Sequence, residues 1–508
     1  MKKFISISNK NRLIESTGVF VFFFLFFLFF FSAAGGALCP DSFYHTKMAQ
    51  LIWEEKSIVS NFPWMQYSTI SGENFVGQHL LFHFLASPFV WLKNFTGMEV
   101  FISLINASFF LVFWLILGKF KVKNKLLLII LLLFSITFLY RLLLLRAIGL
   151  SLIFAFLFLY FLSQKKYLYA FLISFVFMWS YNAFFIVLII GFCFLITEKV
   201  KKKKWNFNYL TWSSLGIAAG AIINPYFPQN ISFFYQQIFI IPLLNGVSSV
   251  GAGAEWYPLT AQSFIKNNFL LWIIFSLILF VIINSGKTIF KKLKTETMAT
   301  LFLSVIFLLL TIRSNRFIEY WTPFTVLAGA LFSRDLNFFA NAKNWLKLYW
   351  LKSKRLILFP ASALIILIAF LFGLSLTKNY NYLKNANPYN RFENSANWLS
   401  ENTKEKSVVY NVSWDNFPEL FYWNDKNYYI IGLDPRFLYK YDKSLHEKYT
   451  AIHAGEIENP SEIIKNDFNS TIVFADNKNK KFLEVAEKDQ NLKKAYQDNW
   501  ATIYRVIE

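Results

Sequence analysis

The sequence predicts a polytopic α-helical membrane protein with about 11 transmembrane helices and a C-terminal extracytoplasmic α/β domain. Hydrophobic residues make up 56% of the chain and charged residues only 16%, whereas charged residues form about a quarter of an ordinary soluble domain. Apolar runs close to the length of a bilayer-spanning helix recur up to about residue 376. Short lysine and arginine clusters separate these runs, as in the cytoplasmic loops of membrane proteins.

The formal net charge of +21 does not indicate a nucleic-acid partner. Nucleic-acid binding needs basic residues gathered on a soluble face, and here many of them lie between apolar segments. The two cysteines, Cys39 and Cys193, fall in a loop and in an apolar run, which favours neither a disulfide framework nor a cysteine metal site. The high hydrophobic content and low charged content of the chain exclude an ordinary soluble enzyme.

The first apolar run, residues 19–37, is expected to be an uncleaved anchor. It is longer than the core of a signal peptide, and many further spans follow it. The basic residues before it place the N-terminus in the cytoplasm. These are Lys2, Lys3, Lys10 and Arg12.

Later basic clusters are also expected in the cytoplasm, so an even number of spans must separate neighbouring clusters. The clusters are 119–125, 165–166, 199–204, 287–294 and 334–355. The predicted spans between and after them are 126–140, 147–163, 167–181, 183–197, 209–225, 268–285, 297–312, 317–333 and 356–376. Parity leaves one span, 98–118, between the outer loop that follows the first span and the cluster at 119–125. Gln78–Leu92, interrupted by Pro88, is then expected along the outer interface.

The last part of the chain changes to a polar composition with short β-prone runs at 407–412, 428–432 and 470–475. We therefore predict two domains. Residues 1–376 form the transmembrane domain, with outer loops at 38–97 and 224–268, and residues 377–508 form a soluble α/β domain outside the membrane.

Candidate functional residues lie on the predicted outer side. Asp41 follows the first span directly, where a carboxylate can serve chemistry at the membrane surface; the alternative is a helix N-cap. Glu255 and Trp256 follow a glycine-rich stretch, 246–254, that suits a closing loop, although Glu255 is equally consistent with a solvated loop residue. Trp414 and Asp415 follow a predicted strand, where ligands often bind and where packing or capping residues also occur.

Four arginines lie at the outer ends of predicted spans, where the distribution of topogenic charge gives no reason for them. They are Arg141, Arg146, Arg313 and Arg316. Guanidinium groups bind phosphate bidentately, so these residues are candidate phosphate ligands. Arg313 and Arg316 are expected on one helical face. The alternatives are contact with lipid headgroups or an ion pair with Glu319.

Taken together, these residues resemble the GT-C class of polytopic glycosyltransferases, and in particular the catalytic subunits of prokaryotic oligosaccharyltransferases. Asp41-Ser42-Phe43-Tyr44-His45 resembles the Asp-Pro-Tyr-Tyr-His-type motif of their first outer loop. Trp414-Asp415-Asn416 is similar to the core of their Trp-Trp-Asp-Tyr-Gly motif, with Ser413 in place of the first Trp. Residues 316–323 resemble their arginine-bearing late span, and Glu255 resembles the glutamate of their flexible outer loop. Protein mannosyltransferases and lipid-A aminoarabinose transferases share the class.

The resemblance implies an enzyme of the plasma membrane that moves a sugar or glycan from a polyprenyl-phosphate or polyprenyl-pyrophosphate donor to a glycan, lipid or protein acceptor on the outer face. The implied catalytic residues are Asp41, His45 and Glu255. The implied donor phosphate ligands are Arg141, Arg146, Arg313 and Arg316. The implied acceptor or sugar ligands are Tyr44, His79, His83, Trp256, Trp414 and Asp415.

One departure concerns the metal. The oligosaccharyltransferases place a metal-binding acid in the second outer loop, whereas residues 141–149 contain no carboxylate. No cofactor is therefore predicted, and a carboxylate-bound Mg²⁺ or Mn²⁺ ion stays open.

Two other classes of function are consistent with the sequence. A transporter or flippase for lipid-linked sugars would use the same arginines, but it would need polar residues deep within its spans, where this chain has mainly Leu, Ile, Phe and Ala. A non-catalytic membrane anchor presenting the C-terminal domain as a binding module would not need so many spans.

The predicted topology can be tested with reagents that do not cross the membrane. We expect an impermeant thiol reagent to label Cys39 in intact spheroplasts, because the loop after the first span lies outside. A phosphatase fused after Glu508 should be active outside the cytoplasm. A cytoplasmic C-terminus would contradict the span parity.

Overall fold

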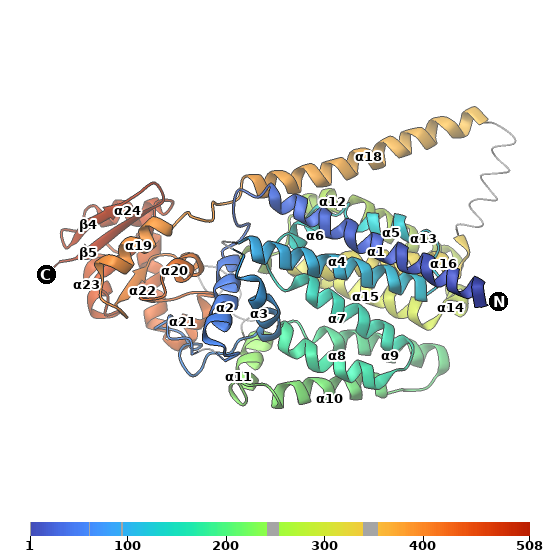
Figure 1. Ribbon diagram of the computed structural model, residues 1–508, viewed down its shortest axis with the longest axis horizontal. Helices are drawn as coiled ribbons and strands as arrows, with labels where there is room; N and C mark the ends of the chain where they lie inside the picture. The colour runs from blue at the N-terminus through green and yellow to red at the C-terminus, as the bar shows by residue number, and fades with distance from the viewer. Residues whose placement is uncertain (1, 60, 93–94, 241–252, 339–353, 508) are drawn as a thin grey trace. The chain divides into compact units, whose positions relative to one another are not determined.

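The computed structural model describes residues 2–59, 61–92, 95–240, 253–338 and 354–507, and most of them are helical (Figure 1). The chain divides into two compact units. The first, which we call the helical unit, comprises Met1–Ala34, Glu99–Gly220 and Glu255–Asn385. The second, the sheet unit, comprises Gly35–Met98, Ala221–Ala254 and Ala386–Glu508. The sheet unit thus contains the whole of the first predicted outer loop, 38–97, and residues 224–254 of the second, together with the C-terminal residues.

Apolar helices build the helical unit. Its longer helices are α1 (Lys2–Ser32), α4 (Thr96–Lys119), α7 (Ile148–Ser163), α8 (Tyr167–Ser180), α9 (Ile186–Lys202), α10 (Asn208–Ile222), α13 (Phe269–Ser285), α15 (Thr295–Arg313), α16 (Ile318–Asp335) and α18 (Lys354–Lys384). The shorter ones are α5 (Lys125–Leu132), α6 (Ile136–Leu142), α12 (Ala261–Asn267) and α14 (Ile289–Lys292). Each predicted span lies largely on one of these helices or, for 126–140, on the α5–α6 pair.

Four helical segments in the described part of the chain are long and apolar enough to cross a membrane. They are Arg12–Ser32, Thr96–Lys119, Phe269–Lys292 and Thr295–Arg313. Helices α5 and α6, bent by 81° at their junction, give a fifth if the pair forms one span. Helices such as α7 and α8 are apolar but shorter. The protein is thus a multi-pass membrane protein, and the count of about 11 spans stays a prediction.

Helix α1 ends earlier than the predicted first span, at Ser32 instead of residue 37. The chain beyond it pairs as an isolated bridge, in which the Ala37 amide donates to the Asn387 carbonyl at 3.0 Å. A Cβ atom on Gly36 would lie only 1.7 Å from that carbonyl oxygen. The bridge therefore requires glycine at position 36, because any side chain would push the two backbones apart.

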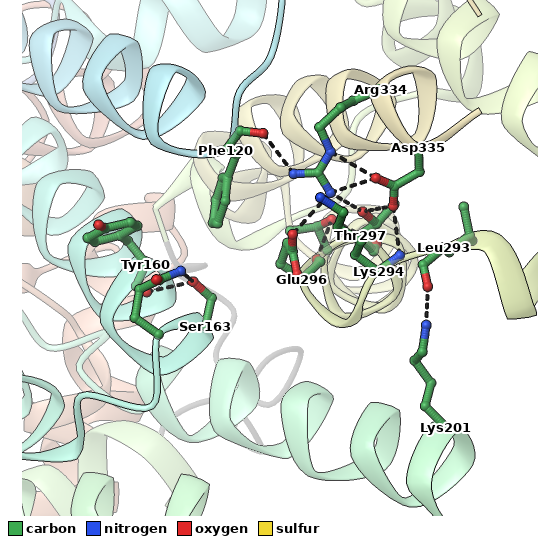
Figure 2. Close-up of polar contacts among 12 residues, drawn as sticks. Phe120, Tyr160, Ser163, Lys201, Leu293, Lys294, Glu296, Thr297, Arg334 and Asp335 are labelled. Atoms are coloured by element: carbon green, nitrogen blue, oxygen red, sulfur yellow. Dashed lines mark hydrogen bonds and ion pairs between the residues drawn. The ribbon is translucent and has the colours of Figure 1, made fainter. Parts of the chain in front are cut away.

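A partly buried arginine joins three segments of the helical unit (Figure 2). Arg334, near the end of α16, donates from Nη2 to Glu296 of α15 at 3.0 Å and from Nη1 to the carbonyl oxygen of Phe120 at 2.9 Å. Its Nε donates to Asp335 at 2.8 Å. The Phe120 carbonyl belongs to the turn directly after α4, so one side chain satisfies acceptors from three elements.

The sheet unit contains a five-stranded mixed sheet with the order β2-β1-β3-β5-β4. The strands are β1 (Val408–Asn411), β2 (Tyr428–Tyr429), β3 (Ile472–Asp476), β4 (Leu492–Gln497) and β5 (Ala501–Val506). Strand β1 pairs parallel with β2 and β3, whereas β5 pairs antiparallel with β3 and β4. The sheet helices are α19 (Glu393–Asn402), α20 (Phe417–Trp423), α21 (Arg436–Tyr441), α22 (Lys443–Ala454), α23 (Pro460–Asn466) and α24 (Lys480–Ala486).

The prediction of an α/β domain in this region is confirmed, and so are the three predicted strands at β1, β2 and β3. Strand β3 is central, and all five of its residues are buried. The β4–β5 hairpin was missed. Strand β4 lies at the sheet edge with mostly exposed residues, including Lys493 and Lys494, so its sequence lacks the apolar run that marks a buried strand.

The parts of the sheet unit outside the C-terminal region are mainly helical. They contain α2 (Asp41–Glu55), α3 (Leu80–Ala86), the 3₁₀ turn η1 (Ser87–Phe89), α11 (Gln229–Tyr235) and the π-turn η2 (Gln236–Ile240). Helix α2 begins at Asp41, and α3 with η1 lies within Gln78–Leu92, the segment predicted to lie along the outer interface.

Candidate functional site

A network of buried charges lies in the helical unit around Arg141, at the end of α6. Arg141 donates to Glu319 of α16 through Nε at 3.1 Å and Nη2 at 2.8 Å. Its Nη1 donates to Glu255, in the 3₁₀ turn η4 (Ala254–Trp256), at 2.5 Å. The guanidinium group thus uses its planar fork to hold two carboxylates from distant parts of the chain.

Two more arginines complete this network, which we call the arginine cluster. Arg146, between α6 and α7, donates to the same Glu255 oxygen at 2.7 Å. Arg316, in the 3₁₀ turn η6 (Asn315–Phe317), donates to the Tyr181 hydroxyl at 3.1 Å and to the Asn182 side-chain oxygen at 3.0 Å. Tyr181 in turn donates to Glu319 at 3.3 Å.

The segment that carries Glu255 is fixed by backbone contacts. Ser314 donates from its hydroxyl to the Glu255 carbonyl at 2.9 Å, and the Asn315 amide donates to the Tyr257 carbonyl at 3.1 Å. The Trp256 ring lies 5.1 Å from the Arg316 guanidinium carbon, a cation–π distance. The loop residue and the late helical turn are therefore parts of one local structure.

The arginine cluster has an excess of positive charge. Three guanidinium groups, of Arg141, Arg146 and Arg316, surround two carboxylates, of Glu255 and Glu319. Burial alone would raise the pKa of Glu255, but the charges of Arg146, Arg141 and Arg316 outweigh it and hold that pKa well below its usual range. Glu255 is consequently ionised, and the cluster is electrostatically suited to accept a further anion.

Three of the four arginines predicted to bind phosphate lie close together in the structure. Arg141, Arg146 and Arg316 meet, whereas Arg313 is exposed at the end of α15. The prediction that Arg313 and Arg316 share a helical face is wrong, because Ser314 adopts extended backbone angles (φ −149°, ψ 123°) and ends the helix between them. The alternative pairing of Arg316 with Glu319 is also not observed as a direct bond, since Glu319 binds Arg141.

Sequence reasoning missed the polar partners that hold the arginines. Tyr181 and Asn182 directly follow α8, and Glu319 was considered only as a partner of nearby arginines. A buried glutamate within an apolar helix is a recognisable signal, because a carboxylate there needs a cation. The sequence does not show which of the four arginines supplies it.

Asp41 is the first residue of α2, and Pro40 occupies the N-cap position. The alternative of Asp41 as the N-cap is therefore wrong, although a carboxylate in the first turn still interacts favourably with the helix dipole. Tyr44 and His45 follow on the same helix and are buried. Their predicted sugar-binding and catalytic roles stay predictions.

His45, His79 and His83 meet in the interior of the sheet unit, where one ring nitrogen from each lies within 4.8 Å of those from the other two. All three side chains are buried. His45 was predicted as part of the Asp41 motif and the other two histidines as sugar ligands, so the cluster itself was not predicted. The available signal was the spacing of His79 and His83, which places two imidazoles one helical turn apart.

Trp414 and Asp415 lie in a 3₁₀ turn, η7 (Trp414–Asn416), directly after β1, as predicted. Asp415 is exposed, and Trp414 packs against the hydrophobic core of the sheet. In the same region, Arg391 and Glu419 form a buried pair with bonds of 2.9 and 2.5 Å. Most of the glycine-rich stretch 246–254 lies outside the described residues.

No protein-family model matches the sequence, and no curated protein matches it. Solved structures with the same fold do. The archaeal oligosaccharyltransferase AglB from Archaeoglobus fulgidus, in complex with an inhibitory peptide and a dolichol-phosphate, matches with a TM-score of 0.65 and 13% identity over 98% of this chain and 75% of that chain. ArnT from Cupriavidus metallidurans, bound to undecaprenyl phosphate, matches with a TM-score of 0.57 and 12% identity over 96% of this chain and 98% of that chain. Both belong to the GT-C superfamily, so the predicted GT-C-like fold is confirmed.

The two carboxylates of the arginine cluster should differ in their contribution to stability. Glu319 is fully buried, whereas the Glu255 side chain is 17% exposed. Glu319→Gln removes the fully buried carboxylate that pairs with Arg141. We therefore expect the free energy of unfolding to fall by about 3–5 kcal/mol, the range for breaking a buried ion pair. Glu255→Gln should lower the free energy of unfolding by less.

The measurement is the melting temperature of purified full-length variants in one detergent, followed by tryptophan fluorescence. Glu401→Gln, at an exposed position, is the control. A Glu319→Gln variant as stable as the control would show that the pair does not stabilise the helical unit.

Proposed function

We propose that the protein is a membrane glycosyltransferase that moves a sugar or glycan from a polyprenyl-phosphate or polyprenyl-pyrophosphate donor to an acceptor on the outer face of the membrane. The arginine cluster is the observation that carries this proposal. It presents excess positive charge within a fold that AglB and ArnT share, and solved structures of both contain a polyprenyl phosphate.

The cluster would bind the phosphate of the donor. Arg316 is held by neutral oxygen atoms of Tyr181 and Asn182, so these contacts orient its guanidinium without cancelling its charge. Arg141 and Arg146 share one oxygen atom of Glu255. A phosphate group would compete with that carboxylate for the same N–H groups, and the turn that carries Glu255 would respond to donor binding.

The chemistry would follow from this charge. As the bond between the sugar and the phosphate breaks, negative charge grows on the departing phosphate, and preorganised guanidinium groups stabilise it. Asp41 would act as general base on the acceptor hydroxyl or amide, or orient it for attack. No step in this scheme requires a metal ion, so Mg²⁺ or Mn²⁺ dependence stays a separate question.

The donor-binding role of Arg316 is tested by Arg316→Lys. Lysine keeps the charge but loses the planar fork, so the affinity for polyprenyl phosphate should fall at least about tenfold. Arg313→Lys is the matched control, because Arg313 is exposed and lies outside the cluster. The measurement is binding of polyprenyl phosphate to the purified protein in lipid nanodiscs. Equal affinities for the two variants would contradict the assignment of the cluster.

The catalytic role of Asp41 is tested by Asp41→Asn. The amide cannot accept a proton, so turnover should fall by about 100-fold or more while donor binding stays nearly unchanged. Turnover is followed as lipid phosphate or pyrophosphate released from donors that carry a sugar. Full turnover in Asp41→Asn would place the base elsewhere. Movement of intact donor across the bilayer without release of lipid phosphate would instead indicate a flippase.

A further inference from the structure

The histidine cluster of the sheet unit has the composition of a metal site. His45 lies on α2, His79 stands at the N-cap position of α3, and His83 lies one turn further along α3. The exposed fractions of these side chains are 2%, 7% and 1%. The chain has only five histidines in total, so the burial of three of them in one place is a specific arrangement.

Its geometry is close to that of three ligands around one ion. Nδ1 of His45 and Nε2 of His83 are 2.8 Å apart, and all three ligand atoms lie within 4.8 Å of one another. A tetrahedral zinc ion with Zn–N bonds of about 2.0–2.1 Å holds its nitrogens roughly 3.3 Å apart. To bind the ion, the two closest ring nitrogens must therefore move slightly apart. The two most distant ring nitrogens must approach each other by less than the length of one Zn–N bond.

We infer that His45, His79 and His83 form a binding site for a first-row transition-metal ion, with Zn²⁺ as its natural probe. Three imidazoles are a ligand set that zinc, copper, iron and nickel accept, whereas Mg²⁺ prefers oxygen ligands. Three protein ligands also leave a fourth coordination position for water or another group.

The hydrogen bond between two of the rings is compatible with ligation. In the hydrogen bond between His45 and His83, one ring carries the proton that lies between the two nitrogens. Metal binding would replace this bond, and the proton would move to the outward-facing nitrogen of the same ring without a change in net charge.

The surroundings supply a rigid shell and a nearby negative charge. The rings of Tyr44 and Phe82 contact His45 edge-on at centroid distances of 5.4 Å for both. Asp41 lies one helical turn before His45 on α2, so their Cβ atoms are roughly 5–6 Å apart. A metal here would link α2 to α3 and close the intervening chain, which stabilises the fold by the free energy of binding. It would also fix the helix that carries Asp41.

The direct test uses the full-length protein, purified with an affinity tag that contains no histidine. The protein is stripped with a chelator, reloaded with Zn²⁺ or Co²⁺, and its metal content is measured by mass spectrometry. We expect one ion per chain and, for Co²⁺, visible d–d absorption bands of a four-coordinate site. An excess of Mg²⁺ should displace neither ion. A wild-type protein that retains no Zn²⁺ and gives no such bands would overturn the inference.

Variants identify the ligands. His79→Gln and His83→Gln should each weaken Zn²⁺ binding by at least about 100-fold, because each removes one of three ligands. His453→Gln is the matched control, since His453 lies on α22 and contacts the Val412 carbonyl instead. Zn²⁺ should raise the melting temperature of the wild type and of His453→Gln, and not that of His83→Gln. Equal Zn²⁺ affinity in His83→Gln and His453→Gln would show that the bound metal lies elsewhere. None of these measurements depends on transferase activity.

Discussion

The buried ion pair of Arg141 and Glu319 is the interaction on which the candidate site depends. A carboxylate with no exposed surface in an apolar helix cannot remain ionised without a cation in direct contact. Arg141 supplies this cation and has one remaining N–H edge, which binds Glu255. Through these two bonds, α6, α16 and the turn η4 acquire one relative arrangement. Arg146 and Tyr181 then join the same two carboxylates.

The division of contacts within the arginine cluster separates structural from exchangeable groups. Glu319 receives two bonds from Arg141 and one from Tyr181, all from buried atoms, so its loss would leave several donors unsatisfied. Glu255 accepts from two arginines through a single oxygen and is the more exposed carboxylate. An incoming anion can offer these arginines the same acceptors at a smaller cost than it would meet at Glu319. The cluster thus has one fixed and one replaceable counterion.

The parts of this protein that follow from local pattern could be predicted, and the parts that depend on distant pairing could not. Long apolar runs predicted the helices of the helical unit, and apolar runs at 407–412 and 470–475 predicted β1 and β3. The position of Arg141, Arg146 and Arg316 at the outer ends of predicted spans indicated that they belong to a functional site. The sequence did not show that Arg313 lies outside the arginine cluster, because this depends on the extended backbone of Ser314. It also did not show that Arg141 binds both glutamates, because 178 residues separate Arg141 from Glu319.

The histidine cluster shows that a sequence pattern can identify important residues and still suggest the wrong role for them. The spacing of His79 and His83 places them one helical turn apart, but this spacing gives no information about which other side chains pack against them. In the structure, His45 of α2 lies beside these two histidines, so the three together form a possible metal-binding set. A buried guanidinium needs a carboxylate beside it, whereas neutral imidazoles can be buried without counterions. The two units therefore differ in their buried polar groups: the helical unit pairs buried charges of opposite sign, and the sheet unit gathers three buried imidazole rings that a metal ion could join.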